Sequence, residues 1–510
     1  MKIAKILLLG TGIVLVAALI ILSGRRAQIP EQQATGPQPV LPAPSKRLIP
    51  TIDIAQAKGW SNGAKPIPAA GLAVDAYASG LDHPRWLYVL PNGDVLVAET
   101  NAPPQPEEGR GIKGWIFKLA LERAGAATPS ANRISLLRDA DSDGIAETRT
   151  VFLQGLNSPF GMALIGNDLY VANTDAILRF TYTEGATQIT APGVKIADLP
   201  AGSLNHHWTK SLIASPDGSR LYVGIGSNSN VGENGLDKEQ GRACILEIDP
   251  QTGASRVFAS GLRNPVGMDW EPKTGVLWTV VNERDELGSD LVPDYLTSVK
   301  EGGFYGWPFS YWGQHVDDPV EPANPKLVAE AIVPDYALGN HTASLGLAFS
   351  AGTLLPEKYR SGAFIGQHGS WNSIPESGYK VEFVPFANGQ PTGSPTEVLT
   401  GFLSDTDRAF GRPVGVVIDR TGALLVADDV GNVVWRVKAN AQEQSSSVRR
   451  SRQRGSFGQD YAAAALATLG IGLETTKRKD GLRRLDLTSR TAASSSLKAL
   501  RFMVATFLLW

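Results

Sequence analysis

Cysteine is almost absent from this chain of 510 residues, because Cys244 is the only one. A single cysteine excludes an internal disulfide and a metal site built from several cysteines. Net charge is nearly absent too, at −2, so the composition gives no reason to expect a nucleic-acid partner. Glycine and proline are plentiful, with 54 and 33 residues, as is typical of many short strands joined by turns.

The first 26 residues resemble a targeting segment. Residues 1–5 are basic, residues 6–22 form an uncharged apolar run just long enough to span a bilayer, and Arg25-Arg26 follow. No small-x-small cleavage site comes next, so a signal peptide and an uncleaved inner-membrane anchor both fit, and the anchor is favoured. Residues 27–60 are rich in proline and glutamine and are predicted to be a linker. We therefore expect a periplasmic or cell-envelope protein that contacts the membrane through its N-terminal helix.

Six segments share one pattern: an apolar strand, a turn and a second strand of the Leu-Tyr-Val type. They lie at residues 81–99, 156–171, 203–227, 262–280, 344–366 and 411–427. Internal repeats of β units at intervals of about 50 to 80 residues indicate a propeller with long insertions. The sequence thus predicts an all-β, six-bladed β-propeller at residues 61–438. Residues 439–510 lack the pattern and are predicted to form an irregular basic and Ala-rich tail.

The starts of the first strands in successive blades should converge at one end of the central channel. This would bring together Arg85, His207, Arg263, His341 and Arg412. Charged and imidazole groups at equivalent positions of successive repeats are hard to explain as core residues.

A histidine pair, His206-His207, comes just before the third repeat. Paired histidines are usually surface residues, but a position directly ahead of a strand favours a functional role for one of them. A neutral imidazole with a near-neutral pKa suits removal of a hydroxyl proton at physiological pH.

Two further motifs carry polar groups at strand ends. Arg263-Asn264 could be a surface turn or could bind an anion through a guanidinium with an amide beside it. His368, in the segment 366–372, could hold a polar ligand or simply cap a loop.

Acidic residues gather in two loops that could bind calcium, which prefers oxygen ligands. Asp139, Asp141 and Asp143 alternate as in a calcium loop, but position twelve is threonine, and a tight acidic turn is an equal alternative. Asp285 and Glu286 lie in a second loop that offers carboxylates and turn carbonyls.

Five motifs in order resemble the L-sorbosone dehydrogenase family, relatives of the soluble quinoprotein glucose and aldose sugar dehydrogenases. The likeness covers about residues 75–438 and rests on HxxxxxxxxPDGxxLYV from residue 207, GLRNPxG at 261–267, KEGGFYGWP at 300–308, HGSWN…GYKV at 368–381 and GRPVG…DD at 411–429.

The resemblance implies a six-bladed propeller that binds pyrroloquinoline quinone (PQQ) and calcium near the channel mouth. It implies that His207 is the general base, that Arg263 and Asn264 contact the quinone, and that Arg412 binds a PQQ carboxylate. Asp285 and Glu286 fall where backbone carbonyls bind the catalytic calcium. Two other residues are added as cofactor-binding from their place in the repeats, namely Arg85 and His341.

One departure from the glucose enzymes lies on the fifth repeat. Their PQQ-binding lysine is replaced by the segment Gln367-His368-Gly369, and Lys380 is several residues further on. This leaves open whether His368 holds PQQ instead or whether PQQ is bound weakly or not at all.

The expected function is oxidation of an aldose or sugar aldehyde, with electrons passed to an external acceptor such as a quinone or cytochrome. His207 would take the hydroxyl proton, and Arg263 would stabilise the negative oxygen. A metal-dependent propeller lactonase and a non-catalytic propeller that binds sugar or protein are the alternatives. Scarce carboxylates at the strand starts count against the lactonase.

Overall fold

The computed structural model describes residues 26–45, 51–61, 63–104, 121–351 and 354–443, and the short strands β32 (Leu473–Glu474) and β33 (Asp486–Leu487). The chain divides into two compact units, residues 1–440 and 441–510. In the second unit, β32 and β33 pair antiparallel. The predicted membrane segment and most of the predicted tail lie outside the described residues. Among the described helices, none has the length and apolarity needed to cross a membrane.

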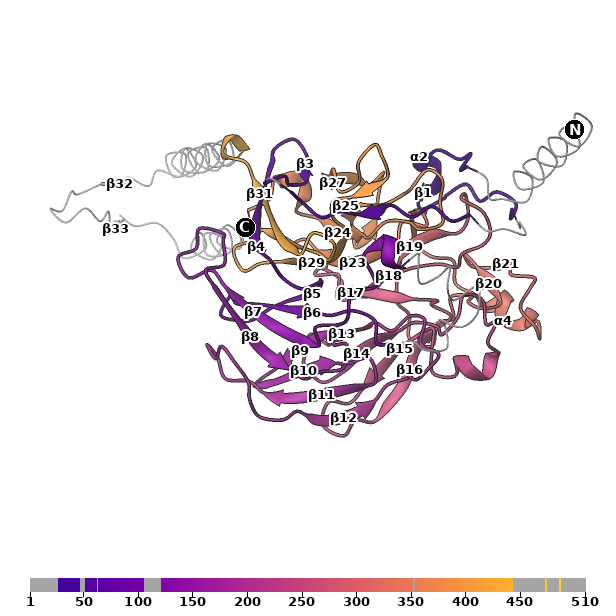
Figure 1. Ribbon diagram of the computed structural model, residues 1–510, viewed down its shortest axis with the longest axis horizontal. Coiled ribbons are helices and arrows are strands. Elements are labelled where there is room, and N and C mark those ends of the chain that lie inside the picture. The colour runs from indigo at the N-terminus through magenta and orange to yellow at the C-terminus, as the bar shows by residue number, and fades with distance from the viewer. Residues whose placement is uncertain are drawn as a thin grey trace, which may run out of the picture. The chain divides into compact units, whose positions relative to one another are not determined.

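Six antiparallel sheets form the blades of a β-propeller, as predicted (Figure 1). Blade 1 contains β5 (Pro84–Val89), β6 (Val95–Glu99), β7 (Arg133–Arg138) and β8 (Thr148–Gln154). Blade 2 contains β9 (Met162–Ile165), β10 (Asp168–Ala172), β11 (Ala176–Thr181) and β12 (Val194–Asp198). Blade 3 contains β13 (Lys210–Ala214), β14 (Leu221–Ile225), β15 (Cys244–Ile248) and β16 (Ser255–Ser260).

The remaining three blades complete the ring. Blade 4 contains β17 (Pro265–Trp270), β18 (Leu277–Val281), β19 (Pro293–Ser298) and β22 (Tyr336–Asn340). Blade 5 contains β23 (Ser344–Phe349), β24 (Gly362–Gln367), β25 (Lys380–Ala387) and β27 (Thr396–Thr400). Blade 6 contains β29 (Pro413–Ile418), β30 (Leu424–Asp428), β31 (Val433–Ala439) and β4 (Leu72–Ser79). Each predicted repeat therefore supplies the two inner strands of one blade.

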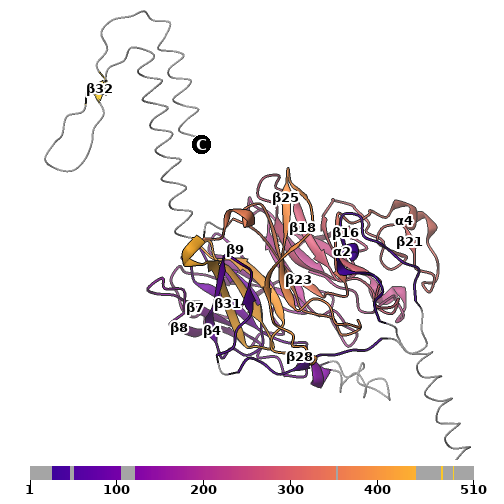
Figure 2. The same cartoon turned by 90° about the horizontal axis from the view of Figure 1, so that it is seen from above.

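Blade 6 closes the propeller with strands from both ends of the domain. Its outer strand β4 comes before blade 1 in the chain and pairs antiparallel with β31, and Figures 1 and 2 show the two side by side. The inner strands β5, β9, β13, β17, β23 and β29 contact one another in sequence, and β29 contacts β5. The first and last segments of the domain thus hold the ring shut through backbone hydrogen bonds.

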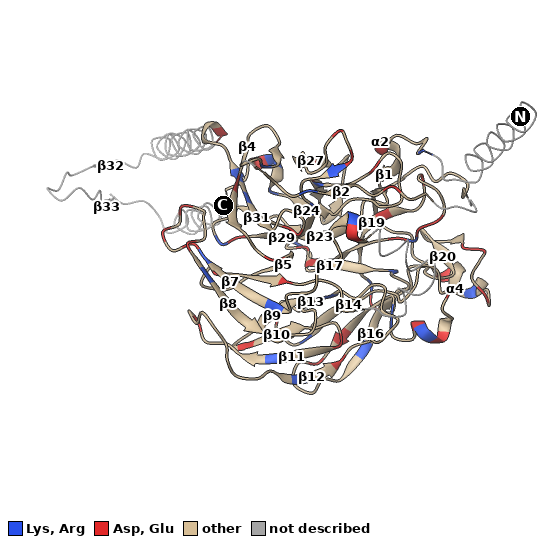
Figure 3. Ribbon diagram, viewed as in Figure 1, with Lys and Arg blue, Asp and Glu red and all other residues tan. Residues whose placement is uncertain are grey.

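Short elements lie in the connections. Strand β20 (Ser310–Tyr311) pairs with β21 (His315–Val316), and β26 (Gln390–Pro391) pairs with β25. Helix α4 (Pro325–Glu330) begins at a proline behind an asparagine cap whose side chain accepts from Leu327 N, a favourable start for a helix. The 3₁₀ turns are η1 (Leu236–Glu239) and η2 (Glu357–Tyr359). Figure 3 shows acidic and basic residues interspersed over the described blades.

Among the described residues, buried apolar side chains form six clusters, one at each interface between neighbouring blades. For example, Trp86 and Phe152 of blade 1 pack with Phe180 of blade 2. A sheet buries both faces when it is stacked between two others, so each blade depends on its neighbours. Cys244 lies in the cluster between blades 2 and 3, and burial raises the pKa of its thiol to about 12, which fits a structural residue.

Glycines in the inner strands let adjacent blades approach closely. A Cβ added to Gly346 of blade 5 would lie 2.2 Å from the Val414 carbonyl oxygen of blade 6. Backbone cannot move aside as a flexible side chain can. The glycine that recurs in the predicted repeats is therefore required by inter-blade packing.

Gly346→Ala should lower the free energy of unfolding by about 3 kcal/mol, because the new methyl group overlaps the Val414 carbonyl. Gly166→Ala is the control, since no atom lies within 4 Å of its Cβ position and only its positive φ of 58° is unfavourable. That change should cost roughly 1 kcal/mol. Chemical denaturation of both variants checks the difference, and equal losses would contradict this account of the packing.

The segment predicted to be a linker lies against the propeller in its described parts. Helix α2 (Glu31–Ala34) and β1 (Thr35–Gly36) contact the edge strand β22, and β2 (Gln56–Ala57) pairs with β28 (Arg408–Ala409). Strand β3 (Ile67–Pro68) then extends blade 5 through β27. We call residues 26–45 and 51–61 the N-terminal strap. Proline-rich composition favours extended backbone, and here β1 adds a strand to blade 4, whereas β2 and β28 form a separate two-stranded sheet.

Candidate functional site

Most of the predicted site residues lie at one end of the propeller channel, which we call the mouth. The first strand of each blade starts there and, because neighbouring strands are antiparallel, the second strand ends there. Residues before the first strands therefore meet residues that follow the second strands. The contacts below group them into two clusters, one around His207 and one around Asp429.

His207 is held in one tautomer by the end of β14. Its Nδ1 lies 3.0 Å from both the carbonyl oxygen and the Oγ of Ser227. Ser227 Oγ donates its own hydrogen to Ser229 O, so both Ser227 atoms act as acceptors toward the imidazole. The proton of the neutral ring therefore sits on Nδ1 and leaves the Nε2 lone pair available. Burial, Arg263 and His206 together hold the pKa of His207 well below its usual value.

A glycine at the end of β14 allows this arrangement. A Cβ added to Gly226 would lie 2.3 Å from His207 Cβ and 2.5 Å from Asn264 Oδ1. The Asn264 amide donates to Asn282 Oδ1 over 3.3 Å, whereas its own Oδ1 is buried and has no hydrogen-bond partner among the described residues. The imidazole and an unpartnered amide oxygen thus lie on either side of one glycine.

Arg263 is held by hydrogen bonds from all three of its guanidinium nitrogens. Its Nη2 lies 3.1 Å from Asp285 Oδ2 and 3.0 Å from Asn230 Oδ1, its Nη1 donates to Glu283 O over 2.7 Å, and its Nε donates to Asn230 O over 3.1 Å. Trp307, in the motif at 300–308, donates to the same Asn230 carbonyl over 2.9 Å. That motif therefore supports the loop that holds Arg263.

The Asp285 carboxylate is ionised, and both of its oxygens accept hydrogen bonds. Its Oδ1 accepts from Asn372 over 2.6 Å, and its Oδ2 from Arg263. Burial would raise the pKa of Asp285, but Arg263 and His341 outweigh it and lower the pKa to about 2. Its backbone carbonyl accepts from Arg284 Nε over 2.9 Å.

His341, predicted to bind cofactor, has both ring nitrogens facing protein atoms. Nε2 lies 2.9 Å from Gly288 O, and Nδ1 lies 3.3 Å from Asn372 Nδ2 and 3.7 Å from Asp285 Oδ1. Burial lowers its pKa, but Asp285 more than offsets this, so the pKa is raised. These contacts suit a residue that positions Asp285 and Asn372.

The second cluster surrounds Asp429, which follows β30 and escaped the sequence-based assignment. Its Oδ2 lies 2.8 Å from Arg85 Nη1, 2.9 Å from His368 Nε2 and 3.5 Å from His83 Nε2. Burial would raise the pKa of Asp429, but the facing histidines and Arg85 hold it far below its usual range. The carboxylate thus joins groups from blades 1, 5 and 6. Extending the comparison of the repeats to the ends of their second strands would have found it.

Arg412 lies beside the second cluster with donor capacity left. Its guanidinium stands 4.9 Å from the Tyr379 ring centroid, and its Nη2 reaches Ala55 O of the N-terminal strap at 3.5 Å. The Nε atoms of Arg412 and Arg85 are buried without a hydrogen-bond partner among the described residues. The Arg85 guanidinium also lies 5.8 Å from the Trp208 ring centroid, which joins the two clusters.

Lys380 takes no part in the mouth. It lies on β25 and forms ion pairs with Glu31, Glu382 and Glu397. The position before His368 is filled by Gln367, which is buried and donates to Leu338 O and Glu382. Lys380 therefore does not replace the lysine of the glucose enzymes, and His368 is the polar group at that strand end.

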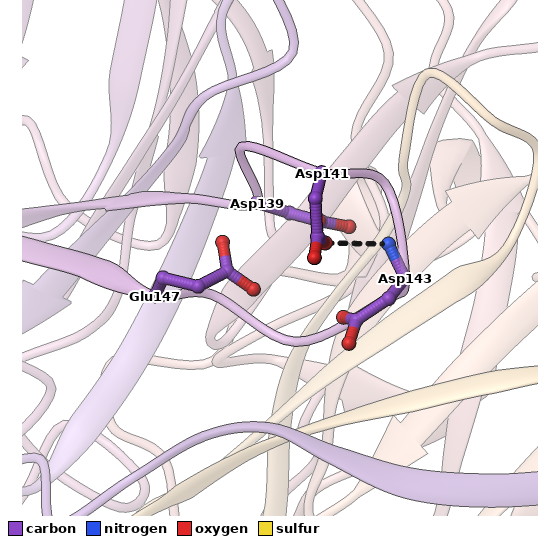
Figure 4. Close-up of side chains that lie close together, drawn as sticks. All are labelled: Asp139, Asp141, Asp143 and Glu147. Atoms are coloured by element: carbon purple, nitrogen blue, oxygen red, sulfur yellow. Dashed lines mark hydrogen bonds between the residues drawn. The ribbon is translucent and has the colours of Figure 1, made fainter.

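The other predicted calcium loop connects β7 and β8 at the end of the propeller opposite the mouth. Figure 4 shows its acidic side chains facing one another, and their oxygens lie within 4.8 Å: Asp139, Asp141, Asp143 and Glu147. Backbone amides of the loop also bind these carboxylates, as the tight-turn alternative requires. No other such group of three or more metal-ligating residues exists among the described residues. Asp285 and the exposed Glu286 do not form one.

The mouth can therefore bind an anionic, polar ligand. Arg85 and Arg412 offer buried Nε donors without a partner among the described residues, Asn264 an unpartnered amide oxygen that can accept, and His207 a neutral base. These groups fit PQQ, a flat quinone with three carboxylates. The catalytic calcium fits less well, because both carboxylate oxygens and the backbone carbonyl of Asp285 already accept from nitrogen donors.

Comparison with solved structures supports the fold. A Trichoderma reesei protein of carbohydrate-active enzyme family AA12 matches with a TM-score of 0.60 and 19% identity over 74% of this chain and 100% of that one. The PQQ domain of a Coprinopsis cinerea pyranose dehydrogenase matches with a TM-score of 0.59 and 21% identity over 76% of this chain and 100% of the domain.

Sequence comparison finds homologues among PQQ-dependent sugar dehydrogenases. The PQQ-dependent pyranose dehydrogenase of Coprinopsis cinerea is 24% identical over 434 residues, which span 72% of this chain but only 54% of that protein. The aldose sugar dehydrogenase YliI of Escherichia coli is 27% identical over 62% of this chain and 82% of its own length. The TrAA12-like family model matches residues 128–295 and 316–440, more than half of the chain. The chain belongs to the TrAA12-like family.

Proposed function

We propose that this protein is a PQQ-dependent dehydrogenase that oxidises an aldose or a sugar aldehyde such as L-sorbosone and passes the electrons to an external acceptor. The observation that carries the proposal is His207, a half-buried neutral imidazole whose Nε2 is available beside Arg263 and Asn264. Homology to PQQ-dependent sugar dehydrogenases supports the same chemistry. A cell-envelope location follows from residues 1–26, and fractionation of cells tests it.

Each of these residues of the mouth has a separate role in the proposed reaction. His207 Nε2 takes the proton from the reacting hydroxyl or aldehyde hydrate, and the Ser227 carbonyl then stabilises the charged ring through Nδ1. Arg263 supplies a fixed positive charge for the oxygen that becomes negative. Arg85 and Arg412 would hold carboxylates of PQQ. Bound PQQ would supply the quinone that accepts two electrons.

Calcium is proposed only at the loop that contains Asp139, Asp141 and Asp143, where it would stabilise the fold. No step of the reaction is assigned to a metal at Asp285 and Glu286, since both carboxylate oxygens of Asp285 already accept hydrogen bonds from Arg263 and Asn372. The loop with Asp139, Asp141 and Asp143 lies at the opposite end of the propeller from the mouth, so a calcium ion bound there would not contact substrate.

Calcium should raise the melting temperature by a few degrees, through preferential binding to the folded state. The double variant Asp141→Asn/Asp143→Asn should lose this gain, because it removes two charges and keeps the acceptors of the turn. Asp198→Asn, at an exposed aspartate paired with Lys195, is the control and should keep the gain. Thermal melts with and without calcium make the measurement. Equal gains in all three proteins would show that the loop is only an acidic turn.

Titration of the full chain with PQQ tests the function. Cofactor absorbance and dye reduction would be followed with a panel of aldoses and aldehydes, including L-sorbosone. Stoichiometric uptake with turnover supports the dehydrogenase. If folded protein takes up no PQQ the proposal fails, and lactone opening would then indicate the hydrolase, whereas neither activity would indicate a binding protein.

A further inference from the structure

Asn230, in the loop that connects β14 to β15, contacts both Arg263 and Asp285. Its carbonyl oxygen accepts from Arg263 Nε over 3.1 Å and from Trp307 Nε1 over 2.9 Å. Its Oδ1 accepts from Arg263 Nη2 over 3.0 Å and from the Asp285 amide over 2.9 Å, and its Nδ2 donates to Asp285 O over 3.4 Å. One residue of blade 3 thus binds two polar residues of blade 4.

The loop fixes Asn230 from its own side. The Glu233 carboxylate accepts from the amides of Asn230 and of the next residue, over 3.1 and 2.7 Å. The Glu239 carboxylate accepts from the Asn228 amide over 2.9 Å and from the Ser229 hydroxyl. These two carboxylates hold the backbone on both sides of Asn230. The fold itself therefore orients this residue, and no ligand is needed for that.

The orientation of Arg263 depends on these contacts. A guanidinium and a carboxylate commonly form a bidentate pair with two parallel hydrogen bonds. Here Arg263 Nη2 binds Asp285 Oδ2 over 3.1 Å and is shared with Asn230 Oδ1, while Nε binds Asn230 O. If the Asn230 side chain were removed, Nη2 would keep Asp285 as its partner. The guanidinium should then turn further toward that carboxylate.

Arg263 and His207 are neighbours through Ser227. The Ser227 amide donates to Arg263 O over 2.8 Å, and the Ser227 carbonyl oxygen lies 3.0 Å from His207 Nδ1. Burial is the main cause of the lowered pKa of His207, and the Arg263 charge is the next. The place of the guanidinium therefore affects the base as well as the oxygen that becomes negative in the proposed reaction.

We propose that Asn230 is a positioning residue, which holds the Arg263 guanidinium in one orientation beside His207 before cofactor and substrate bind. Its effect on catalysis rests on the proposed function. Asn230 acts through Arg263, whose charge is needed in the transition state, so its loss should lower kcat more than it changes KM. A misplacement of about 1 Å can cost about 10²-fold in rate.

Asn230→Ala tests the contact with Arg263 in the full chain without cofactor. The charged or titratable groups that act on His207 are Arg263, His206 and Lys210, and Asn230 is bonded to the first of them. Since a positive charge lowers the pKa of an imidazole, His207 should titrate at a higher pH in Asn230→Ala than in the wild type. NMR titration of histidine-labelled protein makes the measurement, with the His207 signal assigned by its loss in His207→Gln.

Asn234→Ala is the matched control. Asn234 lies in the same loop, and its amide donates to Asn228 Oδ1 over 3.0 Å. This variant removes an asparagine side chain from the loop and leaves the Asn230 contacts with Arg263 and Asp285 in place. Its His207 titration and its kcat should match those of the wild type.

Turnover with PQQ tests the effect on the reaction. Asn230→Ala should lower kcat by at least about tenfold, with KM and PQQ affinity within about threefold of the wild type. Asn230→Gln keeps the amide group but moves it by one methylene, so it serves if Asn230→Ala does not fold. A positioning role predicts a loss of kcat in Asn230→Gln too, whereas a residue needed only for stability would keep kcat.

The two proposals fail in different ways. If neither the wild type nor the variants turn over with PQQ, the proposed function fails, but a raised His207 titration in Asn230→Ala would still show that Asn230 holds Arg263. Turnover with unchanged kcat and unchanged His207 titration in Asn230→Ala overturns the inference and keeps the dehydrogenase. A lower melting temperature as the sole change, or a higher KM at constant kcat, also overturns the inference.

Discussion

Replacing His207 by glutamine should lower kcat by about 10²- to 10⁴-fold, because the variant lacks the base that takes the substrate proton. Glutamine keeps a polar side chain that can still donate to Ser227, so the protein should fold with little change in melting temperature. Stopped-flow or dye-coupled turnover with PQQ-loaded protein makes the measurement. Unchanged turnover in a variant that binds PQQ normally would remove His207 from the reaction.

The pH profile gives a second, independent check on His207. Because burial and Arg263 hold its pKa well below 6.5, the imidazole stays neutral and active as the pH falls through 6.5. The acid limb of kcat/KM should therefore lie well below pH 6.5 and should disappear in His207→Gln. An acid limb at 6.5 would mean that the base is an ordinary solvated histidine. His206→Gln is the control, since the His206 ring lies against His207, with the ring centroids 4.7 Å apart, but no role in the reaction is assigned to it. It should leave most of kcat and shift the acid limb slightly upward, because one neighbouring imidazole that lowers the His207 pKa is lost.

The blades and the site residues that precede inner strands could be predicted from the sequence, because both depend on a local pattern. The glycine that recurs in the inner strands, such as Gly346, can be recognised in the sequence because two blades approach closely at that position. The residue just before such a strand must lie at the mouth, which was enough to locate His207, Arg263 and Arg412.

The roles of Asp429 and His341 could not be predicted, because they depend on contacts with residues far away in the chain. The end of the second strand places Asp429 at the mouth, but its contacts with Arg85 and His368, which lie 344 and 61 residues away, do not follow from any local pattern. His341 was assigned to the cofactor by its place in the repeat, but the contact that decides its role is Asp285.

The N-terminal strap shows the limit of composition as a guide. A proline-rich stretch reads as a linker because it lacks an apolar period, yet Ile54 and Ala55 are buried and Ala55 O accepts from Arg412. Trp60 donates to Asp428 over 2.7 Å, next to Asp429. A protein that began at residue 61 would lose these contacts, so functional assays need the strap.

Asp429→Asn should cost about 3–5 kcal/mol of stability and weaken PQQ binding by at least about tenfold. The change leaves the Arg85 guanidinium without its counter-charge. Removing one partner of a buried ion pair is strongly destabilising because the other charge stays buried and uncompensated. The freed Arg85 and His368 also lose the acceptor that orients them toward the mouth. Since the pKa of Asp429 is lowered, its contribution to stability is present above about pH 4, the unfolded value, and fades only as the pH falls further.

A matched pair separates the loss of stability from the loss of binding. Asp419 and Arg436 form an ion pair at 2.9 Å in the same blade, with side chains 10% and 7% exposed, but Asp419 lies in the turn after β29, at the end away from the mouth. Asp419→Asn should lower the melting temperature and leave PQQ affinity unchanged. The double variant Asp429→Asn/Arg85→Met should regain stability relative to Asp429→Asn, because the uncompensated charge is gone, but should still bind PQQ weakly. If Asp429→Asn and Asp419→Asn affect PQQ binding equally, Asp429 stabilises the fold alone. If only Asp429→Asn weakens PQQ binding, the Asp429 carboxylate positions the cofactor-binding side of the mouth.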